Sequence, residues 1–417
     1  MRKTVLPEMI FDADDRWYRA IFNAIALEWS GVVMPKIVKI KDETLREGEE
    51  TPGVKLTVED KLRVAYKLIE MGIEEVEVGY CGAIKEHYEL AKLFKKEGLS
   101  LKLSSHTRAW GKGDSWKYEI EKGIESGADI VNLLAKASDS QLALSPWLKK
   151  EDIPARVYDT VSYSKKCGAY TAFGLADPAR TNIEYVIKCY EAAIQAGVDR
   201  MYIYDGPGCA SAEAIEYLTK LIRAISGGSI EIAVHCHNDF GLATANSIAA
   251  VKGGATIIDA VINGLGDRAG NAPFEEVVCA LEVLYDVRTG IDITKITEMS
   301  NLVSQIYKVP VAPNKAIVGN NCYRHVSDSH VATLLRGGWD SFEVIKAEAL
   351  GKERSLEFGV TTLQEGEGAL SAKIESMGYE ATKDLVDLLR NKVREKLVDR
   401  EFIDEDGIES LVSELVK

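Results

Sequence analysis

A regular alternation of short β-branched segments and longer amphipathic segments constrains the fold of this chain more than any other feature. Eight of the short segments predict strands, at 37–42, 75–79, 100–105, 130–134, 170–175, 201–205, 230–235 and 256–262. The segments between them predict helices, including 58–71, 87–97, 183–196, 212–224, 242–253 and 274–285. Eight strand–helix units over about 250 residues predict an α/β fold of the (β/α)8 TIM-barrel type.

An open, doubly wound sheet is the alternative architecture. It is less favoured because no Gly-x-Gly-x-x-Gly sequence follows the first strand. Beyond the alternation, helical patterns follow at 294–307, 327–336, 372–377 and 382–397. We therefore expect an N-terminal extension at 1–34, a catalytic barrel at 35–288 and a smaller, mostly helical C-terminal subdomain at 289–417.

The overall charge and the cysteine pattern exclude several classes of protein. The chain has 417 residues and a formal net charge of −14, a poor match for nucleic acid or an anionic membrane. No apolar run reaches the roughly 18 residues of a membrane span, and no signal-peptide pattern follows Met1. The seven cysteines lack Cys-x-x-Cys spacing, which is typical of a reducing compartment. We expect a soluble protein of the cytoplasm.

Two histidines stand at the end of the seventh predicted strand. His235 and His237 are two residues apart, so on a strand their side chains project from the same face. Two neighbouring imidazoles suit one metal ion, whereas the alternative is a pair of structural, hydrogen-bonded histidines. The polar residues at the other strand ends favour the metal site.

Polar side chains also occupy or follow the other predicted strands, at the rim where barrels hold their active sites. They are Asp42, Glu77, His106, Arg108, Asp205 and, after the eighth strand, Asn271. A carboxylate and an amide oxygen complement two imidazoles on Mg²⁺, Mn²⁺, Co²⁺ or Zn²⁺, and the sequence does not choose among these ions. A divalent ion polarises the carbonyl of a 2-oxo acid, and Arg46 is placed to stabilise an enolate or alkoxide. Carbon–carbon bond formation or cleavage beside a carbonyl is the expected chemistry.

Three motifs together resemble the metal-dependent barrel superfamily of 2-isopropylmalate, homocitrate and citramalate synthases and their lyase relatives. They are Asp-Glu-Thr-Leu-Arg-Glu-Gly-Glu at 42–49, His-Cys-His-Asn-Asp at 235–239 and Gly-Leu-Gly-Asp-Arg-Ala-Gly-Asn at 264–271. The resemblance runs from about residue 36 to at least 351. It implies a homodimer that condenses acetyl-CoA, or another acyl-CoA, with a 2-oxo acid in a Claisen reaction.

The resemblance also implies roles for individual residues. Asp42, His235 and His237 would ligate the metal, with Asn271 as a fourth candidate. We expect catalytic roles for Arg46 and Glu47, and for His325 and His330 as general acid–base groups. The residues expected to bind substrate are Arg46, Glu77, His106, Arg108, Gln141 and Asp205.

Several positions depart from the pattern of the synthases. Gly206 and Pro207 stand where the family usually has threonine and an aliphatic residue, and Gln141 stands where histidine is usual. Phe342 replaces an expected tyrosine. These changes predict an altered substrate shell around a retained metal centre. A metal-dependent aldolase or lyase is the main alternative function, and a catalytically silent metal-binding regulator is a weaker one.

Overall fold

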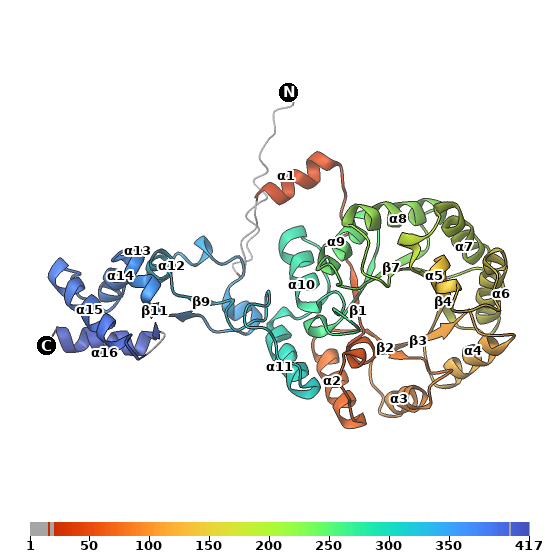
Figure 1. Ribbon diagram of the computed structural model, residues 1–417, viewed down its shortest axis with the longest axis horizontal. Coiled ribbons are helices and arrows are strands. Elements are labelled where there is room, and N and C mark those ends of the chain that lie inside the picture. The colour runs from red at the N-terminus through yellow and green to blue at the C-terminus, as the bar shows by residue number, and fades with distance from the viewer. Residues whose placement is uncertain (1–15, 17–20, 400–401, 417) are drawn as a thin grey trace. The chain divides into compact units, whose positions relative to one another are not determined.

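The computed structural model describes residue 16 and residues 21–399 and 402–416 (Figure 1). The chain divides into two compact units. One spans 21–311 and the other comprises the described residues from 312 onward together with Arg16. Of the predicted N-terminal extension at 1–34, residues 1–15 and 17–20 lie outside the described part of the chain. Helix α1 (Ile21–Ser30) precedes the first strand.

Eight parallel strands of the first unit close into a barrel (Figure 1). They are β1 (Lys39–Asp42), β2 (Glu75–Gly79), β3 (Lys102–Arg108), β4 (Ile130–Lys136), β5 (Tyr170–Ala176), β6 (Arg200–Asp205), β7 (Glu231–Cys236) and β8 (Ile257–Ala260). The last strand pairs with the first, with Lys39 beside Ile257 and Asp42 beside Ala260. The predicted (β/α)8 barrel is confirmed, and the open sheet is excluded.

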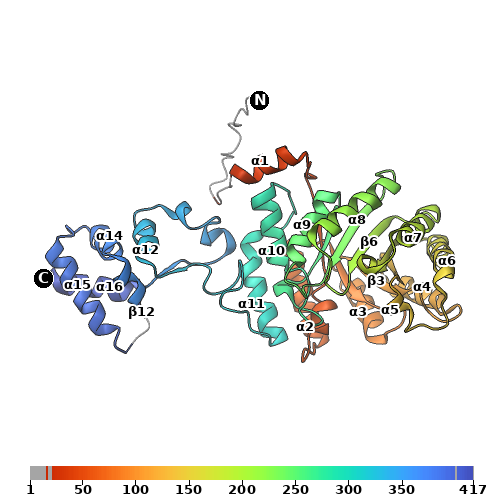
Figure 2. The same cartoon turned by 45° about the horizontal axis from the view of Figure 1, so that its top comes forward.

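Amphipathic helices surround the barrel, as both views show (Figures 1 and 2). They are α2 (Val58–Glu70), α3 (Lys85–Lys96), α4 (Ser115–Glu125), α6 (Ile153–Lys166), α7 (Ile183–Gln195), α8 (Ala212–Ile225), α9 (Ala243–Gly253) and α10 (Phe274–Cys279). The short helix α5 (Asp139–Leu142) follows β4, and α11 (Ile296–Tyr307) follows the last barrel unit. Thr57 and Asp60 form a capping box at the start of α2. Such caps fix where each connecting loop leaves the rim.

Aromatic and aliphatic side chains fill the middle of the barrel. Tyr202 and Tyr204 of β6 stack with ring centroids 5.0 Å apart, and they pack against Ala172, Ala233 and Ile257. A Cβ atom on Gly174 of β5 would lie 2.4 Å from the Tyr204 ring, so glycine is needed there. The interior is therefore a packed core with polar groups above it, not a pore.

The second unit is mostly helical, as predicted, with two small pairs of strands. Its helices are α12 (Asp328–Leu335), α13 (Val360–Glu365), α14 (Gly368–Ser376), α15 (Lys383–Lys396) and α16 (Glu405–Leu415). Strands β9 (Arg324–His325) and β10 (Ser355–Leu356) pair in parallel, and β11 (Phe358–Gly359) and β12 (Phe402–Ile403) pair antiparallel. Buried apolar residues, among them Phe358, Leu370 and Leu389, form its core. No helix within the described ranges is long and apolar enough to cross a membrane.

Candidate metal centre and active site

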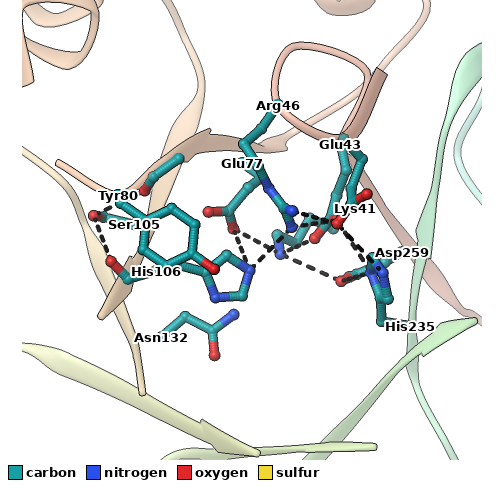
Figure 3. Close-up of polar contacts among 12 residues, drawn as sticks. Lys41, Glu43, Arg46, Glu77, Tyr80, Ser105, His106, Asn132, His235 and Asp259 are labelled. Carbon is teal, nitrogen blue, oxygen red and sulfur yellow. Dashed lines mark hydrogen bonds and ion pairs between the residues drawn. The ribbon is translucent and has the colours of Figure 1, made fainter. Parts of the chain in front are cut away.

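The alternation of side chains along β1 determines which residues enter the barrel. Lys41 projects inward, where its Nζ lies 3.0 Å from Glu77 Oε2 of β2 and 3.4 Å from Asp259 Oδ2 of β8. Glu43, two residues later, points to the same side and reaches His235 of β7. Strand alternation assigns Asp42, between them, to the opposite side, and its carboxylate contacts Thr44. Figure 3 shows the inward-facing side chains converging from several strands.

His235, His237 and Glu47 form a compact group of potential metal ligands. Their ligand atoms all lie within 4.8 Å of one another, and all three side chains are buried. The two histidine Nε2 atoms are 3.3 Å apart, and Glu47 Oε1 is 3.7 Å from Nε2 of His235. Asn271 Nδ2 donates a hydrogen bond to Glu47 Oε2 at 3.2 Å. Two imidazoles, a carboxylate and a neighbouring amide are a donor set for a divalent ion.

The charges and unpaired atoms of this region also fit a cation. Four buried carboxylates, those of Glu43, Glu47, Glu77 and Asp259, surround two buried cations, Lys41 and Arg46. One divalent ion would balance the remaining negative charge. In the described part of the chain, His237 Nδ1 and Asn271 Oδ1 are buried without a hydrogen-bond partner. Buried polar atoms without partners are rare in a completed site.

The carboxylate beside the two histidines is that of Glu47, whereas the sequence predicted Asp42. Asp42 belongs to none of the potential metal-binding groups found among the described residues. Its carboxylate accepts hydrogen bonds from the backbone N–H of Thr44 at 3.0 Å and from Thr44 Oγ1 at 2.7 Å. Burial raises the pKa of Asp42 to about 7. Asp42 thus organises the turn after β1, and the geometry favours Glu47 as the carboxylate ligand.

The two histidines differ in their affinity for a proton. Burial opposes a charge on His235, but the carboxylates of Glu43 and Asp259 outweigh this and raise its pKa to about 10. Burial, and then the charge of His235, lowers the pKa of His237 to about 4. The carboxylates of Glu43, Asp259 and Glu47 therefore stabilise a positive charge at His235. A bound cation would supply that charge in place of the proton, because metal ligation requires a neutral imidazole.

Arg46 lies directly beside this group. Its guanidinium forms a buried ion pair with Glu47, and its Nη2 lies 3.0 Å from Glu43 Oε2 and 3.1 Å from His106 Nε2. The His106 Nε2 is also 3.7 Å from Glu77 Oε2, so the structure brings these predicted residues together. Burial, followed by the charges of Arg46 and Lys41, holds the pKa of His106 well below its usual value. A neutral His106 can donate or accept a hydrogen bond without adding charge.

Two other predicted substrate residues have structural partners. The guanidinium of Arg108 binds the carboxylate of Glu119 in α4, with Nη2 and Oε1 2.6 Å apart. Asp205 accepts hydrogen bonds from the backbone N–H groups of Cys209 and Ala210, which shapes the loop after β6. Both side chains are occupied by these contacts.

Gln141, the third predicted substrate residue outside the cluster, lies in the short helix α5. Its Oε1 is buried and has no hydrogen-bond partner within the described ranges. An unpartnered buried acceptor of this kind can receive a hydrogen bond from a ligand.

The predicted acid–base histidines belong to the second unit, where they form a cluster of their own. His325 Nε2 lies 3.0 Å from Glu343 Oε1, and Arg354 binds the same carboxylate through two contacts of 2.6 Å. The ring of His330 stacks on Phe342 with centroids 3.7 Å apart. Burial lowers the pKa of His325 and outweighs the opposing effect of Glu343, while the charges of His330 and Arg354 add smaller effects in the lowering direction. His325 is therefore held as a neutral imidazole able to accept a proton.

Three site residues were missed from the sequence: Lys41, Glu43 and Asp259. All three are buried in the barrel (Figure 3). A charged residue within an apolar strand is a detectable signal, and Asp259 stands in the predicted strand 256–262. Lys41 and Glu43 flank Asp42, and the alternation of strand faces would have assigned them to the opposite side from Asp42.

Comparison with known proteins gives matches over most of the chain. The model of the HMGL-like family matches residues 37–303. A probable 2-isopropylmalate synthase of Ignicoccus hospitalis is 35% identical over 385 residues, covering 92% of this chain and 94% of that protein. The (R)-citramalate synthase of Methanocaldococcus jannaschii is 35% identical over 359 residues, covering 86% and 71% respectively. The HMG-CoA lyase of Bacillus subtilis superposes with a TM-score of 0.57 at 22% identity, covering 67% of this chain and 96% of that chain. This last likeness concerns the fold alone.

Proposed function

Because this chain belongs to the HMGL-like family, we propose that it is a divalent-metal-dependent synthase that joins an acyl-CoA to a 2-oxo acid. The reaction is a Claisen condensation that forms a carbon–carbon bond and releases CoA after thioester hydrolysis. Acetyl-CoA is the proposed acyl donor. The observation behind this proposal is the group of Glu47, His235 and His237 directly beside the buried guanidinium of Arg46.

Each residue of the site has a proposed task. Glu47, His235 and His237 hold a divalent ion, with Asn271 beside them. When bound, the ion polarises the carbonyl of the 2-oxo acid. Arg46 donates hydrogen bonds to the oxygen on which negative charge develops. We assign hydrogen-bonding roles toward the oxo acid to Glu77 and His106, which share the same buried space.

The remaining predicted residues have narrower proposals. Gln141 offers a free acceptor to a substrate group. Arg108 and Asp205 act on the substrate only through the loops that they hold. His325 accepts a proton as a neutral imidazole, and His330 is its proposed partner in acid–base chemistry.

A thiol-release assay tests the proposal directly. The purified protein, acetyl-CoA and a panel of 2-oxo acids are incubated with each of Mg²⁺, Mn²⁺, Co²⁺ and Zn²⁺, and free CoA is measured over time. We expect release that depends on both the oxo acid and the metal and that stops on addition of a chelator. Release that is unaffected by the chelator or by omission of the oxo acid would contradict the proposal.

The relatives that match over most of their length are named as synthases. This favours condensation over the aldolase or lyase alternative. A parallel incubation with hydroxy acids and no acyl-CoA separates the two, because an aldolase or lyase would cleave a hydroxy acid under these conditions. We further propose that the protein is cytoplasmic and forms a homodimer. Light scattering of the purified protein would test the homodimer.

A further inference from the structure

One carboxylate oxygen contacts both the proposed metal ligand His235 and the proposed catalytic arginine. Glu43 Oε2 lies 3.1 Å from His235 Nδ1 and 3.0 Å from Arg46 Nη2 (Figure 3). The side chain of Glu43 is fully buried. A displacement of this one group would therefore move both the imidazole and the guanidinium.

The other oxygen of Glu43 contacts the buried ammonium of Lys41. Glu43 Oε1 lies 2.6 Å from Lys41 Nζ, and this ammonium also contacts the carboxylates of Glu77 and Asp259. Lys41 is fully buried and lies on β1, two residues before Glu43, which directly follows the strand. Asp259 Oδ2 in turn lies 3.4 Å from His235 Nδ1. The ammonium thus anchors both carboxylates that face this ring nitrogen.

These contacts leave the other nitrogen of His235 free for a metal. The carboxylates of Glu43 and Asp259 lie 3.1 and 3.4 Å from Nδ1, so their charge faces this nitrogen and Nε2 is directed away from them, the arrangement that supporting carboxylates give in many metal sites. Here Nε2 points to His237 and Glu47. The two terminal nitrogens of Arg46 are shared between Glu43 and Glu47, so its guanidinium is fixed against the same group.

We infer that Glu43 is a positioning residue that holds the metal ligand His235 and the catalytic Arg46 in place relative to each other. Lys41 in turn holds the carboxylate of Glu43. The part of this inference that concerns the catalytic role of Arg46 rests on the proposed function. The part that concerns metal binding does not. The inference makes Lys41 and Glu43 functional parts of the proposed active site, although neither would contact the substrate.

The first test is the affinity of the free protein for Mn²⁺. Glu43→Gln preserves the shape but removes the charge that faces His235 Nδ1 and Arg46. We expect its Kd for Mn²⁺, measured by calorimetry without substrates, to rise about 10- to 100-fold, the usual effect of losing a supporting carboxylate. Glu77→Gln is the matched control, because it removes the same charge from Lys41 without contacting His235. Its Kd should rise at least three times less.

The second test separates the two residues that Glu43 positions. At saturating Mn²⁺ the turnover of Glu43→Gln should stay at least tenfold below that of the wild type, because Arg46 has lost a charged partner. A Kd within twofold of the wild type, an equal rise in Glu77→Gln, or full recovery of turnover at saturating metal would each overturn the inference.

A milder variant covers the case in which Glu43→Gln does not fold. Glu43→Asp keeps the charge and withdraws it by one methylene, so the same loss of Mn²⁺ affinity is expected, and a wild-type Kd would again overturn the inference. The outcomes remain distinct from a failure of the proposed function. A wild-type protein that binds Mn²⁺ but releases no CoA with any oxo acid would refute the synthase proposal, while the comparison of Kd values would stand.

Discussion

The two units of this protein each contain a buried histidine and a buried glutamate in contact with an arginine, yet the pKa values of the two imidazoles shift in opposite directions. In the barrel, Glu43 links His235 to Arg46, and in the second unit Glu343 links His325 to Arg354. Burial opposes a proton on either ring. The pKa of His235 is nevertheless raised to about 10, whereas that of His325 is lowered.

The charges that surround each trio explain the difference. His235 faces a second carboxylate, Asp259, and lies near a third, Glu47, so negative charge outweighs burial. Among the described residues His325 contacts one carboxylate, that of Glu343, which also binds Arg354 through two contacts, and the effect of burial outweighs it. The same three residue types therefore create a place for a cation in the barrel and a neutral base in the second unit.

The largest expected effect concerns which carboxylate completes the cation site. Glu47→Ala should lose stoichiometric metal and nearly all activity, because it removes the carboxylate ligand of the group with His235 and His237. Replacing both histidines by alanine should do the same. Metal content after dialysis, measured by mass spectrometry, checks both variants.

Two control variants sharpen this result. Asp42→Asn should retain a full equivalent of metal, because its carboxylate contacts Thr44. His325→Ala should also retain it, because its trio lacks the excess of carboxylates. A metal-free Asp42→Asn protein would support the prediction from the sequence that Asp42 is a metal ligand. A metal-free His325→Ala protein would contradict the distinction between the cation site in the barrel and the neutral base in the second unit.

The next effect concerns the two arginines. Arg46→Lys keeps the charge but loses the planar fork. We expect turnover to fall by about 10²-fold or more, the scale of losing one donor to a developing oxyanion, with little change in melting temperature. Arg354→Lys should lower turnover by much less, because Arg354 contacts Glu343 rather than the reacting atoms. Equal losses in the two variants, measured as kcat in the CoA-release assay, would contradict this distinction.

The sequence was sufficient for the barrel because each strand pattern and its neighbouring helix follow from local alternation of apolar residues. Even so, α10 was expected to run over 274–285, but it ends at Cys279 and continues as a π-helical turn over Ala280–Leu284. Such a change in helical hydrogen bonding depends on packing around the last barrel unit, and the apolar periodicity does not report it.

The site was predicted less completely than the fold. The structure brings together the predicted histidine pair, Arg46 and Asn271, whose motifs lie at strand ends. The carboxylate was assigned to Asp42, because the face on which each residue of β1 points depends on the register of the whole barrel. Arg108 and Asp205 were expected at the substrate, yet Glu119 and two backbone N–H groups occupy them. Residue type alone does not reveal such local partners.

A pH profile probes the second trio. Because the pKa of His325 is lowered, the acid limb of kcat/KM should lie below the usual histidine value of about 6.5. Glu343 favours the charged imidazole, so Glu343→Gln should lower the pKa of His325 further and move the acid limb to lower pH. A limb that does not move would show that His325 is not the titrating base. A shift to higher pH would show that Glu343 acts on a different group.

The smallest expected effect concerns the rim of the barrel, where this chain departs from the synthases. Loss of the usual threonine at Gly206 removes a hydrogen-bond partner for a short oxo acid, so the wild type should use 2-oxoisovalerate and pyruvate poorly and a larger or more polar oxo acid better. A Cβ atom at Gly206 would meet no other atom within 4 Å, so a side chain fits there without strain. Gly206→Thr should therefore raise kcat/KM for the two short acids about tenfold, the equivalent of roughly 1.4 kcal/mol and one net hydrogen bond.

Gly206→Ala fills the same space without the hydroxyl and should not reproduce the gain. If both variants gain equally, volume rather than hydrogen bonding controls the choice of acid. A wild type that already prefers 2-oxoisovalerate would mean that the altered rim is neutral and that selectivity depends on the buried charges around Arg46.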